Sequence, residues 1–210
     1  MTSPSMRVPL TLATLALACV GCSVLKPKPD LTQYYLLRAQ APQSQPGTPA
    51  GSRQTTLIVG PGQLAEYLNS LPILVTEAPN RVRRLDQHQW AEPLASGVNR
   101  VVVENLIHLL PGAELVAYPD TGGRPSWFEL RYHLFKLEGG PGREVVLEVS
   151  WSLREQPNGR PVAERTSTFM VPTGGTPETV DDYVTRLSRA LSDWSILVGQ
   201  TLAPELSENH

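Results

Sequence analysis

Two cysteines, Cys19 and Cys22, are the residues of this chain whose types and spacing most directly suggest chemistry. Their C-x-x-C spacing could serve a thiol redox site or provide half of a zinc site. A redox pair lies near a βαβ unit, and zinc needs about four ligands. The sequence contains no further cysteine, so the spacing favours neither chemistry, and no disulfide can cross-link residues 23–210.

The cysteine pair instead ends a segment that is typical of a secretory signal peptide. Arg7 is the one charged residue among the first 21, and residues 8–18 are largely apolar and end in small side chains. This apolar run is shorter than the roughly 20 residues that a membrane-spanning helix needs. We therefore predict that residues 1–21 are a cleaved signal peptide.

The junction after this segment resembles a bacterial lipobox, in which a small residue precedes an invariant cysteine. Gly21 holds the small position and Cys22 the acylated one. The resemblance implies that the Cys22 sulfur receives a diacylglycerol and that the freed amine receives a third acyl chain, such as palmitate. Three chains would anchor the protein permanently, because each buried methylene contributes about 0.8 kcal/mol. Two alternatives stay open: acylation of Cys19, and a secreted protein with unmodified cysteines.

Ser23 bears on the membrane that the anchor would enter. Sorting systems of such lipoproteins often read an aspartate at this position as an inner-membrane retention signal, and no aspartate is present here. The resemblance therefore implies the periplasmic face of the outer membrane. Residues 26–30, with the sequence KPKPD, then indicate a stiff and polar tether of the extended, proline-rich kind.

Composition predicts one globular domain after the tether. Hydrophobic residues make up 40% of the chain and charged residues 18%, which excludes a wholly disordered protein. A formal net charge of −2 argues against a nucleic-acid binder, which needs a basic surface to replace phosphate counterions. We expect residues 22–33 to be the lipidated N-terminus and tether, residues 34–203 the domain, and residues 204–210 a polar tail.

Hydrophobic periodicity predicts an α+β domain, with a mostly antiparallel sheet packed against two main helices. Short strands are expected at residues 34–37, 55–59, 72–76, 81–87 and 114–118. Gly60-Pro61-Gly62 is expected to end the second strand, and the proline-rich and glycine-rich residues 41–54 to form a loop. Alternating apolar side chains and the Asn158-Gly159 turn predict a three-stranded antiparallel meander from residues 128–134, 145–153 and 162–171.

Two apolar stripes at helical spacing predict the helices. The first follows Pro93, ends before Pro111-Gly112, and carries Leu94, Val98, Val102, Leu106 and Leu109. The second begins near Pro177 and keeps its spacing through Leu202. Glu92 is placed to complement the positive end of the first helix dipole.

The sequence offers no constellation for catalysis. An enzyme needs titratable groups that converge on one site, whereas the four histidines are scattered at positions 88, 108, 133 and 210. No serine-hydrolase elbow, zinc-protease, phosphate-loop or dinucleotide glycine motif occurs. We predict a protein that is not an enzyme and that has no metal and no cofactor.

The segment of residues 83–94 combines charge, an aromatic side chain and a helix start within a short span. One interpretation is that Trp90 holds the loop on the core while Glu92 caps the helix. The other is that this corner belongs to a partner or oligomer interface, where aromatic and arginine side chains are favoured. On the second interpretation, Arg83, Arg84, Trp90 and Glu92 are the candidate contact residues.

Several of these features together resemble the auxiliary lipoproteins of ABC-type transport systems, the PqiC-type family. They are Cys22, Tyr34-Tyr35-Leu36-Leu37, Gly60-Pro61-Gly62 followed by Glu66-Tyr67-Leu68, Trp90-Ala91-Glu92-Pro93-Leu94 and Glu104-Asn105-Leu106. The resemblance runs in order from the anchor to the first helix. It carries over one defined site, the acylated Cys22, and no catalytic residue.

The resemblance implies a role beside a transporter whose periplasmic component stacks MCE domains into a tunnel. The protein would dock the far end of that tunnel at the outer membrane as a homo-oligomeric ring. Phospholipid or another hydrophobic molecule would be the cargo, and the system would support membrane integrity. The alternatives are a solute-binding lipoprotein of an importer and a purely structural envelope lipoprotein.

Overall fold

The computed structural model describes residues 29–40, 55–120, 125–175 and 177–208. Thr32–His210 form one compact unit, and the preceding unit, Met1–Leu31, is described at residues 29–31 alone. The leader, both cysteines, residues 26–28 of the tether and the expected loop at 41–54 lie outside the described residues.

The larger of two sheets has five strands in the order β5-β2-β6-β7-β8. These are β2 (Thr55–Leu64), β5 (Ala113–Ala117), β6 (Trp127–Gly140), β7 (Arg143–Gln156) and β8 (Arg160–Val171). The antiparallel ladders β6-β7 and β7-β8 confirm the predicted meander. β2 lies parallel to both β5 and β6, so the sheet is mixed.

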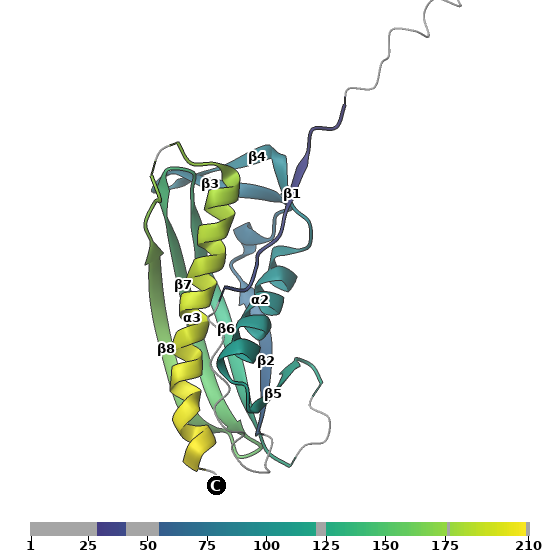
Figure 1. Cartoon of the computed structure of the whole chain (residues 1–210), viewed down its shortest axis with the longest axis vertical. Coiled ribbons are helices and arrows are strands. Elements are labelled where there is room, and N and C mark those ends of the chain that lie inside the picture. The colour runs from purple at the N-terminus through teal and green to yellow at the C-terminus, as the bar shows by residue number, and fades with distance from the viewer. Residues whose placement is uncertain (1–28, 41–54, 121–124, 176, 209–210) are drawn as a thin grey trace, which may run out of the picture. The chain divides into compact units, whose positions relative to one another are not determined.

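A second sheet was not expected from the sequence. It has the order β1-β4-β3 and consists of β1 (Gln33–Tyr35), β3 (Pro72–Ala78) and β4 (Arg81–Trp90). β1 lies parallel to β4, whereas β3 and β4 form an antiparallel hairpin. A short 3-10 helix, η2 (Glu66–Leu68), lies in the connection between β2 and β3. In Figure 1 this smaller sheet lies at the end of the domain where the C-terminal helix begins.

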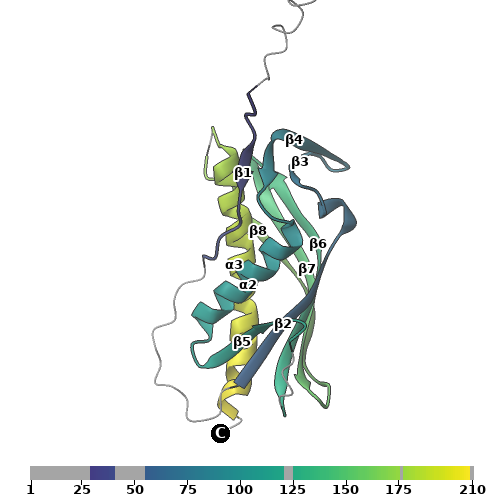
Figure 2. The same ribbon diagram turned by 90° about the vertical axis from the view of Figure 1, so that its right-hand side faces the viewer.

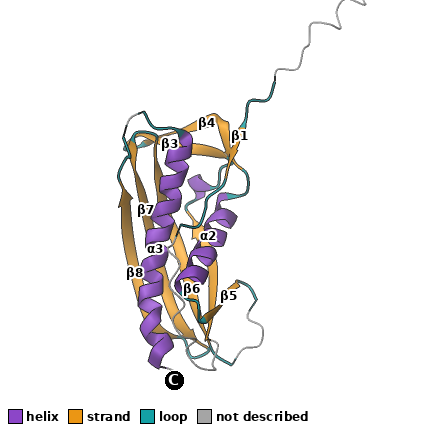
Figure 3. Cartoon of the chain, viewed as in Figure 1, coloured by secondary structure: helices purple, strands orange, loops and turns teal. Residues whose placement is uncertain are grey.

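Both predicted helices, α2 (Leu94–Leu109) and α3 (Val180–Glu208), cover one face of the larger sheet (Figures 2 and 3). Their apolar stripes are buried, and so are the inward side chains of β6 and β7, which confirms the α+β class. Residues 36–40 connect the two helices through hydrogen bonds. The Arg38 amide donates to Ser188 Oγ on α3, and the Gln40 amide donates to Asn105 Oδ1 on α2.

Several strands differ by a few residues from their predicted ranges, and two boundaries change the interpretation of the sequence. Gly60-Pro61-Gly62 does not end β2: the strand continues to Leu64, with a register shift between Val59 and Gly62. A φ of 111° at Gly60 explains why glycine stands at this bulge. α3 continues past Leu202 to Glu208, into the expected polar tail, because Leu206 packs on the core and Glu205 pairs with Arg160.

Candidate functional site

The corner between β4 and α2 is built around Trp90, the last residue of β4. Its indole is 7% exposed and belongs to the core cluster, and its amide donates to the Leu71 carbonyl at 2.8 Å. The adjoining Ala91 amide donates to the Tyr35 carbonyl of β1 at 2.9 Å. Trp90 therefore fixes the corner from inside the domain and presents little surface.

Glu92 at the same corner holds a charge network. Its carboxylate Oε1 accepts a hydrogen bond from Arg100 Nη2 at 2.5 Å. Among the described residues no side chain caps the start of α2, so the interpretation in which Glu92 caps the helix is wrong. Arg100 also contacts Glu104 Oε1 at 3.2 Å and donates to the Leu37 carbonyl at 3.1 Å. The hydrogen bond with Glu92 is the largest cause of the raised pKa of Arg100. The network thereby ties the corner to α2 and to the residues after β1.

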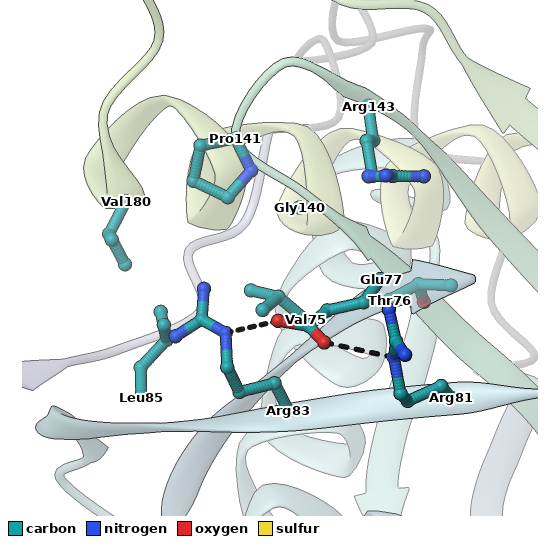
Figure 4. Close-up of a pocket in the computed structure, with 10 residues that line it drawn as sticks. All are labelled: Val75, Thr76, Glu77, Arg81, Arg83, Leu85, Gly140, Pro141, Arg143 and Val180. Atoms are coloured by element: carbon teal, nitrogen blue, oxygen red, sulfur yellow. Dashed lines mark hydrogen bonds and ion pairs between the residues drawn. The ribbon is translucent and has the colours of Figure 1, made fainter.

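A groove of about 470 Å³ lies between the β3-β4 hairpin, the β6-β7 turn and the first residue of α3 (Figure 4). We call it the arginine groove, because its charged lining consists of Arg81, Arg83 and Arg143 with the single carboxylate Glu77. Its remaining lining is largely apolar or backbone: Val75, Thr76, Leu85, Gly140, Pro141 and Val180.

Glu77 orients two of the three guanidinium groups. Its Oε1 lies 2.6 Å from Arg83 Nε and its Oε2 lies 3.1 Å from Arg81 Nε (Figure 4). The arginine side chains stay 55% and 70% exposed. Arg143 extends from the other side of the groove and has no ion pair within the described part of the chain. Three guanidinium groups against one carboxylate give the groove an excess of positive charge, which suits it to bind an anion.

The turn that carries Arg143 is held by a buried ion pair. Arg186 Nη1 donates to the Arg143 carbonyl at 2.7 Å, and Nη2 donates to the Gly140 carbonyl at 3.0 Å and to Glu178 Oε2 at 2.5 Å. The same Glu178 oxygen accepts the Gly142 amide at 2.8 Å. This amide hydrogen bond is the largest cause of the lowered pKa of Glu178. The side chains of Arg186 and Glu178 are 10% and 4% exposed.

The structure separates the residues that the sequence grouped together. Arg83 and Arg84 are consecutive on β4 and project to opposite faces of the small sheet: Arg83 lines the groove, whereas Arg84 is exposed on the other face. Trp90 is buried, and Glu92 is engaged with Arg100. Glu77, Arg81 and Arg143 were not identified from the sequence, because no local pattern indicates that the turn before β7 lies beside the β3-β4 hairpin.

Neither a metal centre nor a membrane span is found in the described part of the chain. Within those residues, no three histidine, cysteine, aspartate or glutamate side chains gather as metal ligands would. None of the described helices combines the length and apolarity that crossing a bilayer requires.

Solved structures of similar fold were found, whereas no curated protein sequence matches. An uncharacterized protein shares 19% identity at a TM-score of 0.65, over 81% of this chain and 98% of its own. A Xanthomonas campestris protein of the family DUF330 shares 21% identity at a TM-score of 0.62, over 84% of this chain and 99% of its own. The PelC dodecamer from Paraburkholderia phytofirmans is a weaker match, with 16% identity and a TM-score of 0.42 over 74% and 92%.

The first two structures show that the fold is shared. A family model provides the stronger evidence, because it matches residues 35–195, from β1 well into α3. It describes a transport component rather than an enzyme, in agreement with the absence of catalytic motifs from the sequence. The protein therefore belongs to the family of ABC-type transport auxiliary lipoprotein components, as its sequence motifs indicated.

Proposed function

We propose that this protein is the outer-membrane lipoprotein of an ABC transport system with an MCE-domain periplasmic component. It docks the far end of the periplasmic tunnel, through which phospholipid or another hydrophobic molecule crosses, and so supports membrane integrity. The observation that carries the proposal is the family match over residues 35–195. Cys22, which follows a leader and a small residue, supports the membrane anchor.

The mechanism relies on position rather than on reactive groups. Acyl chains on Cys22 confine the domain to the plane of the outer membrane. Confinement raises the effective concentration of neighbouring copies and of the arriving tunnel, without any additional contact. Copies of the domain assemble into a ring, and its opening receives the tunnel.

The corner and the β3-β4 hairpin supply the partner or oligomer contacts. Arg84 supports this assignment, because it is exposed and has no ion pair to the described residues. Arg83 and Glu92 are partly exposed and lie on the same hairpin and corner. Trp90 acts from beneath this surface by holding the corner in place.

Crosslinking in the native membrane tests the docking role. A photo-crosslinking amino acid replaces Arg84, and a matched control replaces Arg189, which is 56% exposed on α3. We expect the Arg84 position to capture the MCE-domain protein, with or without a second copy of the chain, and the Arg189 position to capture less of it. Capture of peptidoglycan or of the same chain alone, without any MCE-domain protein, would favour a purely structural lipoprotein.

The anchor is tested separately by mass spectrometry of the natively produced protein. We expect three acyl chains on an N-terminal Cys22, and we expect a high-salt wash to release the folded Cys22→Ser variant from the membrane fraction. Membrane retention of this variant after the wash would point to Cys19 or to a different attachment. An unacylated N-terminus in the natural protein would refute the proposal.

A further inference from the structure

We propose that the arginine groove binds phosphate groups of phospholipid headgroups, and so holds the small sheet against the membrane surface. The proposal rests on the anchored outer-membrane location given above, and it assigns a lipid-binding site within the folded domain. The site consists of Arg81, Arg83 and Arg143 around Glu77.

The hydrogen-bond donors of the groove match a phosphate group. Arg81 and Arg83 both contact Glu77 through Nε, so Glu77 fixes their orientation. Their terminal Nη groups have no hydrogen bond to any described residue, and neither does the guanidinium of Arg143. A planar guanidinium presents paired N–H groups that bind two phosphate oxygens at once. The groove therefore offers several unused donors from two sides.

Apolar side chains accompany these donors. Val75, Leu85 and Val180 line the groove beside the arginines. A surface that combines cationic and apolar side chains fits the boundary between headgroups and acyl chains. An acidic peptide would use the same charges, but nothing in the fold brings such a peptide to this end.

The length of chain between Cys22 and β1 limits how far this end of the domain can lie from the membrane. Gln33, the first residue of β1, follows Cys22 by eleven positions, and a fully extended segment of this length spans at most about 40 Å. β1 pairs with β4, the strand that carries Arg81 and Arg83. An acyl anchor at Cys22 therefore keeps the small sheet within reach of the headgroups, at the end of the domain where α3 begins (Figure 1).

Vesicle sedimentation tests the site without the anchor. The full mature chain carrying Cys22→Ser is mixed with vesicles of phosphatidylglycerol and phosphatidylethanolamine, or with vesicles of a galactolipid that has no phosphate. We expect binding to the phospholipid vesicles and at least five-fold weaker binding to the galactolipid vesicles. Arg143→Gln is expected to weaken phospholipid binding about five-fold, and Arg81→Gln combined with Arg143→Gln to weaken it further.

The control is Arg189→Gln, which removes the same charge from an exposed position on α3. We expect its binding to stay within about two-fold of the parent chain, since headgroup attraction falls off within a Debye length. An equal loss in Arg189→Gln, or equal binding to both kinds of vesicle, would overturn the proposal. Binding of inorganic phosphate to the groove together with equal binding to both kinds of vesicle would identify a small-anion site instead.

The assay distinguishes this proposal from the docking role. Every chain in it lacks the acylated cysteine, and no partner protein is present, so its result does not depend on the transport system. If the protein does not bind vesicles but crosslinking in native membranes captures the MCE-domain protein, the groove proposal is refuted and the docking role is not. Unfolding midpoints of the groove variants provide the check on folding, and exposed arginines should change stability by less than about 0.5 kcal/mol.

Discussion

Replacing Gly62 by alanine tests how the Gly60-Pro61-Gly62 segment works. Gly62 of β2 and Tyr132 of β6 are register partners, and the tyrosine ring lies over the glycine. A Cβ atom at position 62 would lie 2.1 Å from Tyr132 Cζ and 2.3 Å from its hydroxyl oxygen. Backbone strain is not the reason for this glycine, because its φ lies outside the left-handed region that Gly60 occupies at 111°. Gly62 provides space for the ring.

The Tyr132 ring has no room to retreat. It is 4% exposed, its centroid lies 5.0 Å from the Trp194 ring in an edge-on contact, and its hydroxyl donates to Asn99 Oδ1 at 3.2 Å. Overpacking of a filled core costs about 1–3 kcal/mol, and loss of the hydrogen bond adds about 1 kcal/mol. Gly62→Ala should therefore lower the free energy of unfolding by about 2–4 kcal/mol and Tm by roughly 4–16 °C.

Urea unfolding followed by tryptophan fluorescence measures this cost, because Trp194 lies against the ring. Tyr132→Leu removes the clashing atoms, so Gly62→Ala combined with Tyr132→Leu should cost clearly less than the sum of the two single changes. The control is Gly112→Ala, since a Cβ there meets no atom within 4 Å. A Gly62→Ala protein within about 0.5 kcal/mol of the parent, or strict additivity of the pair, would refute this account of the packing.

Four further substitutions test three other features of the fold. Asn105→Ala leaves the Gln40 amide without its acceptor, so it should lower the free energy of unfolding by about 1–3 kcal/mol in a urea titration. An unchanged free energy would mean that the hydrogen bond to Gln40 does not contribute to stability. Trp90→Ala should lower the free energy of unfolding by about 3–5 kcal/mol, because the indole is buried. Arg84→Ala should change it by less than about 0.5 kcal/mol, because Arg84 is exposed. Similar values for the two substitutions would contradict their different burial. The folded-state pKa of Glu178 is lowered, so its contribution to stability is complete above its ordinary pKa of 4.5 and is lost as the pH falls below it. Glu178→Gln should therefore show a smaller decrease in Tm than the parent between about pH 5 and about pH 3, and parallel curves would contradict this assignment.

Local sequence patterns predicted the helices and strands better than they predicted which strands pair with one another. The alternation in residues 128–134 and 145–153 identified β6 and β7 and their buried faces, because one side of each strand packs under the helices. The parallel pairing of β2 with β5 and β6 was not predicted, since periodicity gives the face of a strand but not its neighbour. The same limit hid the second sheet, in which β1 pairs with a strand more than 50 residues away.

The same limit explains why the sequence predicted only part of the candidate site. The charged residues of this segment predicted Arg83 and Arg84 as contact residues. The pleat of β4, however, places Arg83 in the groove and Arg84 on the opposite face. Arg143 follows a predicted glycine turn, and only the tertiary fold brings that turn to the β3-β4 hairpin. Trp90 stood out as an aromatic side chain near arginines, yet its burial gives it a positioning role.

The buried Arg186–Glu178 pair explains why the arginine groove has a defined shape. Glycine turns such as residues 139–142 are ordinarily easy to deform. Here the carbonyls of Gly140 and Arg143 accept hydrogen bonds from Arg186, and the Gly142 amide donates to Glu178. The backbone beneath Arg143 is therefore already ordered before an anion arrives, which reduces the conformational entropy that binding would otherwise remove. Arg186→Met should consequently weaken phospholipid binding even though its own guanidinium is buried, and unchanged binding in a folded Arg186→Met protein would show that the turn needs no such support.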